Sequence, residues 1–347
     1  MSTDHPMTIE PLSIAHPNRW QPLVNEHEAT TPFHTRSWMK AISASFSYDE
    51  QHRLVFCDED LVGVIPGFRT PSVSGSETTN PFCAYGFPLL REGTDAVAVL
   101  EALASNGGLR STRIVKDVPW SGVRGYGRSG YGATETGQTW RLELDAQFET
   151  LWDFDFDTTL RTKIRTARKN LSVQKTTETD AFYRLYCQTM RRKGSPPFPR
   201  QFIDSLIEEF GSNATLLVAD AEGERVAGLL ALDGGSTRSL FVAGSDPEHW
   251  DRYPNDLLYA EQIRRACDEP GIEAVDFGRT DPESGVDEFK RQFGARSEPL
   301  YSFVTPPWRV GRASVSTYRR LEPISRRLSP VIANPTVGPK LKEWIHE

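Results

Sequence analysis

The sequence predicts an α/β (α+β) protein made of two similar domains in tandem, each with a mixed central sheet flanked by helices. Two observations predict this fold class: strands and helices alternate along each half of the chain, and the two halves repeat the same order of elements. The length of 347 residues agrees with it, since a domain averages about 150 residues. The predicted domains span residues 1–150 and 151–308, and a basic helical segment follows at 309–347.

A β-hairpin begins the repeated part of each half. In the first half, residues 53–57 and 61–68 form two apolar strands around the turn Asp-Glu-Asp. In the second half, residues 215–219 and 225–232 form the corresponding pair. The two return strands contain the similar sequences Leu-Val-Gly-Val-Ile and Val-Ala-Gly-Leu-Leu, which indicates an internal duplication.

A helix and then a strand follow each hairpin at similar distances. The helices are predicted at about 95–104 and 256–267, and the strands at 112–116 and 273–277. Both copies therefore have the order hairpin, helix, strand, so the duplication extends beyond the hairpin itself.

Three helices are predicted between the two copies, at 158–172, 181–192 and 201–210. In the first of them, apolar residues recur at i, i+4, i+7 and i+11 and define one buried face. The rest of its surface is basic, and its cations are Arg161, Lys163, Arg165, Arg168 and Lys169. These cations predict either a site that contacts the phosphates of a polyanion or a solvated helix balanced by the acids just before it.

The composition bounds the functional classes. With 38% hydrophobic and 25% charged residues and a net charge of −7, the chain is typical of a soluble globular protein and not of a general nucleic-acid binder. The four cysteines lie far apart and no His-rich motif occurs, so neither a metal site nor a disulfide framework is expected. Because signal-peptide features and long apolar runs are missing, the sequence predicts a cytoplasmic protein.

A single lysine follows the last strand of the second copy. The polar end of this strand runs from Asp276 to Arg279, and a short amphipathic helix then carries Lys290 between two phenylalanines and stops at Gly294. Lysine is used sparingly, with nine lysines against thirty-one arginines. A lysine just beyond a strand end can supply a compact positive charge to a cleft. The alternative is a solvated lysine on a surface helix.

These features together resemble the Fem family of non-ribosomal aminoacyl and peptidyl transferases, and more closely the FemAB-like proteins associated with exosortase and exopolysaccharide systems. The resemblance rests on the duplication, the basic helix Arg-x-Lys-Ile-Arg-x-Ala-x-Lys-Asn and the ending Asp-Phe-Gly-Arg … Phe-Lys-x-x-Phe-Gly-Ala. Two further motifs agree with it, Phe-x-Thr-x-x-Trp at 33–38 and Pro-Phe-x-x-Tyr-Gly at 81–86. It covers about residues 30–305.

The resemblance implies two domains of the GNAT fold and an N-acyltransferase. In Fem enzymes, a free amine of a cell-wall precursor attacks an aminoacyl ester of tRNA, whereas simple GNAT enzymes use acyl-CoA. The family lysine maps onto Lys290, where it binds negative groups of the donor or the developing oxyanion, and Phe289 helps to shape the site. The resemblance thus implies transfer to an amine of a cell-envelope or exopolysaccharide precursor.

Four more residues are candidates for the same site. Asp276 is a candidate general base, with substrate-assisted proton transfer as the alternative. Arg279, at the strand end beside Lys290, is a candidate contact for an anion. Tyr85 and Tyr259 are expected either to line a pocket or to belong to the core.

One departure from acyl-CoA-dependent GNAT domains bears on the donor. Those domains bind the pyrophosphate of CoA with a glycine-containing loop at a helix N-terminus. At the equivalent place this chain has Arg-Tyr-Pro-Asn-Asp-Leu, from Arg252 to Leu257, without glycines, and Asp256 would repel an anion. No tightly bound cofactor is expected, and the donor is an aminoacyl-tRNA or, with less support from this loop, an acyl-CoA.

Two other functions stay open beside an aminoacyl or acyl transferase: an acyl-CoA-dependent N-acetyltransferase and a catalytically silent glycan-binding or scaffold protein. The expected partners are a tRNA donor and an envelope glycan or lipid-linked precursor. Residues 309–347 contain eight Lys/Arg against three Asp/Glu, so this tail could hold the protein at the anionic inner face of the membrane.

Overall fold

The structure is a computed structural model of the whole chain, and it describes eight stretches of it. These are residues 7–12, 18–72, 75–82, 85–106, 111–116, 132–145, 147–280 and 285–304. They divide into two compact units: residues up to 137 together with 299–304, and residues 138–298. In this division the second unit begins at Gln138, and the predicted domain bounds of 1–150 and 151–308 stay a prediction. The predicted basic tail at 309–347 lies outside the described residues.

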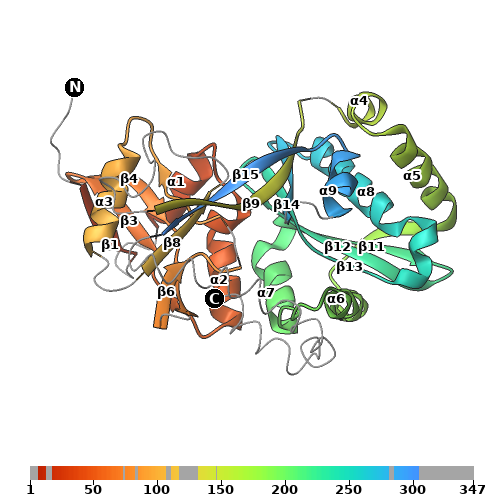
Figure 1. Cartoon of the computed structure of the whole chain (residues 1–347), viewed down its shortest axis with the longest axis horizontal. Coiled ribbons are helices and arrows are strands. Elements are labelled where there is room, and N and C mark those ends of the chain that lie inside the picture. Colours follow the sequence, from red (N-terminus) through yellow and green to blue (C-terminus); the bar gives the residue numbers. More distant parts are fainter. Residues whose placement is uncertain are drawn as a thin grey trace. The chain divides into compact units, whose positions relative to one another are not determined.

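The first unit contains two groups of strands and three α-helices among its described residues (Figure 1). One sheet has the strand order β1-β3-β4-β7, and a second group has the order β15-β8-β6-β5-β2. The elements are β1 Met7–Pro11, α1 Trp20–Glu26, α2 Arg36–Ser45, β2 Asp49–Glu50, β3 Arg53–Cys57, β4 Asp60–Ile65, β5 Phe68–Ser72, β6 Gly75–Thr79, β7 Leu89–Leu90, α3 Ala96–Asn106, β8 Ser111–Lys116 and the end of β15 Arg296–Val304, with the 3-10 turn η1 Pro32–His34.

The second unit has a mixed sheet in the order β10-β11-β12-β13-β14-β9. All neighbouring strands in it are antiparallel except β13 and β14, which run parallel. The elements are β9 Gly132–Glu143, α4 Phe148–Phe154, α5 Thr158–Asn170, β10 Ser172–Thr176, α6 Asp180–Lys193, α7 Arg200–Phe210, β11 Ala214–Ala221, β12 Glu224–Gly234, β13 Thr237–Ser245, α8 Pro254–Asp268, β14 Ala274–Thr280 and α9 Gly285–Arg291, with the 3-10 turns η2 Gly211–Asn213 and η3 Pro247–Arg252.

Helices cover both faces of this sheet. Figure 1 shows α4, α5, α8 and α9 on one side of β11–β13 and α6 with α7 on the other. The predicted apolar stripe of α5 explains its place, because Leu160, Ile164 and Ala167 are buried in the core cluster that α8 also joins. The predicted helices, hairpins and mixed sheet flanked by helices are thereby confirmed.

The parallel pair β13 and β14 stays together for only a short distance. Its register joins Thr237 to Ala274 and ends with Ser239 opposite Asp276. Beyond that point β13 contains a bulge, because Leu230 and Ala231 of β12 pair with Val242 and Leu240 and leave one residue without an opposite partner. The two strands therefore separate next to Asp276, where β14 also becomes irregular.

Helix α6 lies unusually close to β13, and glycine makes this possible. A Cβ atom on Gly244 would stand 2.5 Å from the backbone nitrogen of Tyr186 and 2.7 Å from the carbonyl carbon of Leu185. Because these are backbone atoms of a helix, they cannot move aside as a flexible side chain could. The glycine thus fixes how closely α6 packs on the strand.

Replacing Gly244 with alanine is expected to lower the free energy of unfolding by about 1–3 kcal/mol, the usual cost of overpacking. Urea unfolding followed by circular dichroism measures it. Gly285→Ala is the control, because a Cβ atom there meets open space and its backbone angle is ordinary. Equal unfolding midpoints for the two variants would contradict the close packing of α6.

Candidate functional site

A bulge in β14 forms the floor of the candidate site. Asp276 pairs with Arg141 of β9, but Arg279 pairs with Thr139, so β14 contains one residue more than its neighbour. Gly278 lies inside the bulge with φ +75°, a conformation that glycine adopts without strain. Bulges of this kind redirect backbone groups away from the sheet ladder.

Asp276 holds the bulge in place. Its Oδ1 atom accepts a hydrogen bond of 2.8 Å from the Gly278 N–H and one of 2.7 Å from the Thr139 hydroxyl. Asp276 is 4% exposed, and Thr139 is buried as well. The carboxylate thus links two strands and the bulge at the point where β13 and β14 separate.

Lys290 reaches this bulge from α9. Its Nζ atom donates a 2.6 Å hydrogen bond to the carbonyl oxygen of Gly278, and the side chain is 3% exposed. The alternative of a solvated surface lysine is therefore wrong. Lysines are rarely buried unless an opposite charge lies nearby, so the carboxylates around Lys290 matter for its charge.

The surroundings of Lys290 alter its protonation. Burial lowers the pKa of Lys290 to about 8, although the nearby carboxylates of Asp276 and Asp287 act in the opposite direction. The charge of Lys193, at the end of α6, lowers this pKa further. Near neutral pH the lysine is thus mostly a buried cation that can lose its proton within the physiological range.

Phe289 and Tyr259 hold α9 on α8. The two rings meet edge to face with their centroids 4.9 Å apart, and Tyr259 also stacks on Phe277 of β14 at 5.8 Å. Burial raises the pKa of Tyr259 to about 12, so the phenol stays protonated. Both residues pack against the core cluster of the second unit, and they shape the site by fixing α9.

Of the two remaining candidates, Arg279 follows the bulge and Tyr85 lies in the first unit. Arg279 is an exposed residue of β14, one position after Gly278. That it binds an anion stays a prediction. Tyr85 belongs to the first unit, where it is buried against Phe33. There Phe33 also packs on Trp38, so Phe33, Trp38 and Tyr85 from the two motifs are part of the core of that unit.

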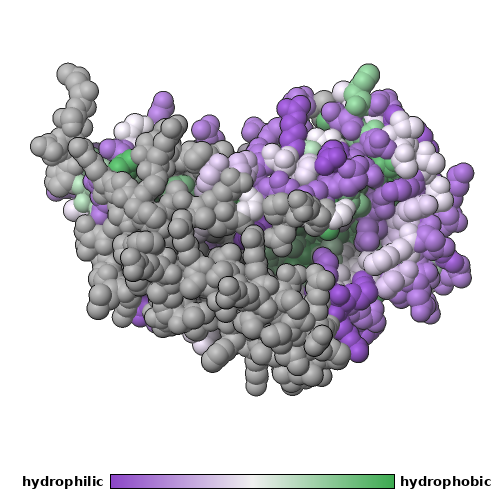
Figure 2. Space-filling view, viewed as in Figure 1, coloured by the Kyte–Doolittle hydropathy of each residue, from purple (hydrophilic) through white to green (hydrophobic). Residues whose placement is uncertain are grey.

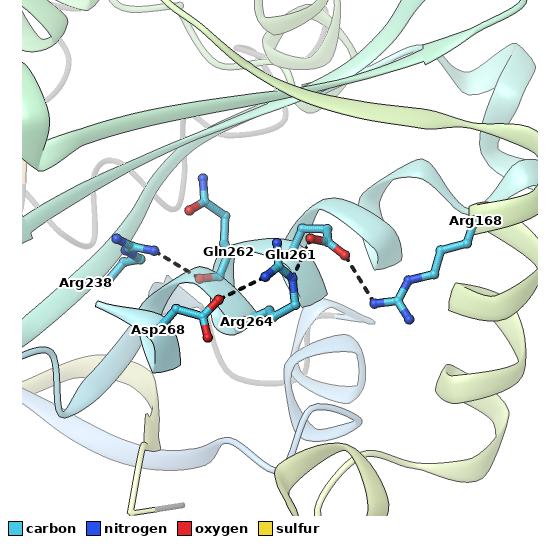
Figure 3. Close-up of polar contacts among 6 residues, drawn as sticks. All are labelled: Arg168, Arg238, Glu261, Gln262, Arg264 and Asp268. Carbon is cyan, nitrogen blue, oxygen red and sulfur yellow. Dashed lines mark hydrogen bonds and ion pairs between the residues drawn. The ribbon is translucent and has the colours of Figure 1, made fainter. Parts of the chain in front are cut away.

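The arginines of α5 contact α4 and α8 rather than α9. Arg161 lies 3.7 Å from a carboxylate oxygen of Asp153, and Arg168 lies 3.1 Å from Glu261 (Figure 3). Arg165 and Arg168 both stand over the ring of Trp152, at 5.5 and 5.3 Å from its centroid. Their predicted contact with a polyanion stays a prediction, and two of the three arginines already have acidic partners.

The start of α8 differs from a phosphate-binding loop. Tyr253 precedes the helix with φ +58°, a backbone conformation that glycine adopts more easily. Asp256 in the first turn is 8% exposed, and burial raises its pKa although Lys163 stands 3.8 Å away. A carboxylate therefore occupies the helix end that usually attracts an anion.

The sequence did not single out Thr139 or Asp287 as members of this site. Asp287 lies three residues before Lys290 on α9, a spacing that places both on one helix face and could have marked it. Thr139 could not be recognised from the sequence, because 137 positions separate it from Asp276.

The described residues contain no group of His, Cys, Asp and Glu that could hold a metal ion. None of the described helices could span a bilayer.

The surface over this unit is mixed. In Figure 2, hydrophilic residues cover most of the side on which Figure 1 shows α4 and α5. A hydrophobic hollow, green in Figure 2, opens below the place of α9 and over the strands of the second unit.

Comparison with known proteins shows which domain the second unit resembles. Residues 155–291, which include α5, the sheet and Lys290, match the family model of the acetyltransferase (GNAT) domain. Residues 155–291 of the second unit are therefore similar to a GNAT acetyltransferase domain, and this similarity supports an acyltransferase. No curated protein matches the chain by sequence.

Solved structures show the same fold at low sequence identity. FemX has a TM-score of 0.65 and 14% identity, over 82% of this chain and 94% of FemX. L-PGS from Bacillus licheniformis has a TM-score of 0.53 and 14% identity, over 83% and 91% of the two chains. A tandem GNAT protein from the clavulanic acid biosynthesis pathway has a TM-score of 0.51 and 12% identity, over 85% of this chain and 98% of that protein. The implied GNAT fold is thereby confirmed, and FemX is among the proteins that share it, in agreement with the resemblance to the Fem family.

Proposed function

We propose that this protein is an N-acyltransferase that moves an aminoacyl group from tRNA to an amine of a cell-envelope or exopolysaccharide precursor. The observation that carries the proposal is the buried ammonium group of Lys290, held on the β14 bulge beside Asp276. Acyl transfer needs a fixed positive charge or hydrogen-bond donor where negative charge develops.

The proposed reaction uses these groups in one sequence. The acceptor amine attacks the acyl carbonyl, and the carbonyl electrons move to its oxygen, which becomes an oxyanion. The Lys290 ammonium stabilises this oxyanion, and the amine releases a proton to Asp276 or to the substrate itself. The oxyanion then re-forms the carbonyl, the ester bond to the donor breaks, and the released hydroxyl takes up a proton.

The start of α8 supports tRNA over acyl-CoA as the donor. The pyrophosphate of CoA would meet the side chains of Tyr253 and Asp256 at that helix end, and a glycine loop is missing there. Ser245 also accepts hydrogen bonds from Trp250 and Asn255, which close the junction between β13 and α8. These residues therefore favour a donor other than CoA at this helix end.

Donor binding tests the proposal. Calorimetric titration of the full chain with a charged tRNA pool and separately with acetyl-CoA is expected to show binding of the charged tRNA alone. Binding should weaken as salt rises, because phosphate contacts release counterions. Transfer of a radiolabelled amino acid to amine-bearing envelope precursors then identifies the acceptor.

The other outcomes separate the remaining functions. Binding of acetyl-CoA alone, followed by acetyl transfer, would replace the proposal with an acyl-CoA-dependent N-acetyltransferase. Binding of neither donor, together with binding of an envelope glycan, would indicate a silent glycan-binding or scaffold protein.

A further inference from the structure

A carboxylate at the start of α9 attaches this short helix to the sheet. Asp287 accepts a 3.0 Å hydrogen bond from the indole N–H of Trp140 and a 2.9 Å bond from the amide group of Gln138. The same indole N–H lies 3.0 Å from the Thr280 hydroxyl at the end of β14. Asp287 is thus tied to β9 directly and to β14 through shared partners.

These hydrogen bonds favour the ionised carboxylate. Partial burial would raise the pKa of Asp287, but hydrogen bonds from Thr280, Trp140 and Gln138 and the charge of Lys290 hold it below its usual value. Accepting several hydrogen bonds at once is typical of a carboxylate that fixes geometry rather than one that exchanges protons.

The spacing of Asp287 and Lys290 connects this anchor to the lysine. Residues three apart on a helix share one face, so Asp287 and Lys290 both point toward the sheet. The acid binds β9 at the start of α9, while the lysine binds the Gly278 carbonyl oxygen near its end. Two polar contacts on one seven-residue helix fix its rotation as well as its position.

We infer that Asp287 is the positioning residue for Lys290: it docks α9 on β9 and thereby places the lysine ammonium on the β14 bulge. This inference rests on the proposed function only for the consequence in catalysis. The contacts of Asp287 themselves are independent of what the protein transfers.

Lys290 is an electrostatic reporter of this arrangement. The charged groups that act on it are Asp276 from β14, Asp287 from its own helix and Lys193 from α6. Without the charge of Asp287, only the carboxylate of Asp276 still raises the pKa of Lys290, while the charge of Lys193 continues to lower it. The pKa of Lys290 is therefore expected to fall. A residue that only packs would not move this value.

The experiment follows the lysine directly in the full chain. Lysine labelled with ¹³C at Cε and ¹⁵N at Nζ gives few signals, because the chain has nine lysines, and loss of one signal in Lys290→Arg assigns it. In Asp287→Asn the titration midpoint of Lys290 is expected to fall by about 0.5–1 pH unit, the low end of the effect of a nearby opposite charge. In Asp287→Ala the ammonium protons should also exchange faster with water.

Glu288→Gln is the matched control. Glu288 is the next residue on the same helix, it is 61% exposed, and it pairs with Arg291 at 2.8 Å. The same loss of one negative charge there should leave the Lys290 midpoint unchanged, because exposed charges are screened. Equal midpoints in Asp287→Asn and wild type, or equal shifts in both variants, would overturn the inference.

Kinetics separate this inference from the proposed function. Asp287→Asn is expected to lower kcat roughly 10-fold with little change in KM. The reason is that Lys290 stabilises the transition state rather than the bound substrate, and a displaced lysine does so less well. If the midpoint moves while Lys290→Ala leaves transfer unchanged, Asp287 still positions the lysine, and the proposed role of Lys290 in transfer is wrong.

Discussion

Replacing Lys290 with methionine is expected to lower kcat by about 10²-fold, the usual effect of removing one group that stabilises an oxyanion. Methionine keeps much of the length of the side chain, so the core around Phe289 and Phe293 stays filled. Steady-state transfer at saturating donor measures the effect. Lys175→Met is the control, because Lys175 is exposed on β10.

The same substitution should raise stability near neutral pH. The pKa of Lys290 is about 8 in the folded protein and 10.5 as an unperturbed lysine, so keeping it charged costs folding about 3 kcal/mol. Loss of the hydrogen bond to Gly278 offsets part of this, on the order of 1 kcal/mol. We therefore expect the free energy of unfolding of Lys290→Met to exceed that of the wild type by about 1–2 kcal/mol.

The sign of the pH dependence is fixed by the lowered pKa. The folded state binds fewer protons than the unfolded state between pH 8 and 10.5, so wild-type stability from this group rises with pH in that window. The advantage of Lys290→Met is complete below pH 8 and disappears toward 10.5. Urea unfolding of both proteins at neutral pH and inside the window tests this. A variant that unfolds more easily at every pH would show that the lysine stabilises the fold.

Replacing Asp233 with alanine is expected to lower the free energy of unfolding by about 3–5 kcal/mol, because it leaves a buried arginine charge without its partner. Arg238 is 2% exposed and makes two hydrogen bonds to the Asp233 carboxylate, of 2.8 and 2.7 Å. It also donates to the backbone oxygen of Gln262 on α8 at 3.2 Å (Figure 3). This pair joins β12, β13 and α8.

Two further variants check the cause of this loss. Glu288→Ala breaks an exposed pair with Arg291 and should change the free energy of unfolding by less than about 0.5 kcal/mol. The double variant Asp233→Leu with Arg238→Met should recover most of the stability, since it removes both buried charges together. A loss in the double variant as large as in Asp233→Ala would assign the effect to packing instead. Unfolding midpoints in urea measure all three.

Much of the fold could be predicted because its signals are local. The apolar stripe from Leu160 to Ala167 predicts a helix from spacing alone, and α5 spans Thr158–Asn170. The hairpins follow from alternation and turn residues, and β11 and β12 pair around residues 222 and 223. Helix α8 begins at Pro254, two residues earlier than predicted, because proline suits the first helical turn.

The partners of the basic residues of α5 could not be predicted from local sequence patterns. The sequence placed five cations on this helix and left two readings open, a polyanion site or a solvated face. The acids that pair with them include Glu261 and Asp256, nearly a hundred residues later in the chain. Because those partners come from α8, only the packing of the two helices could supply them.

By itself, the sequence determined the elements, their duplication and the resemblance that made Lys290 a candidate. The tertiary structure decided the environment of that lysine. Its burial, its bond to Gly278 and the carboxylates of Asp276 and Asp287 arise from a bulge, a strand pairing with β9 and the docking of α9. Burial and electrostatic coupling depend on distances between residues far apart in sequence, which residue types and spacing do not encode.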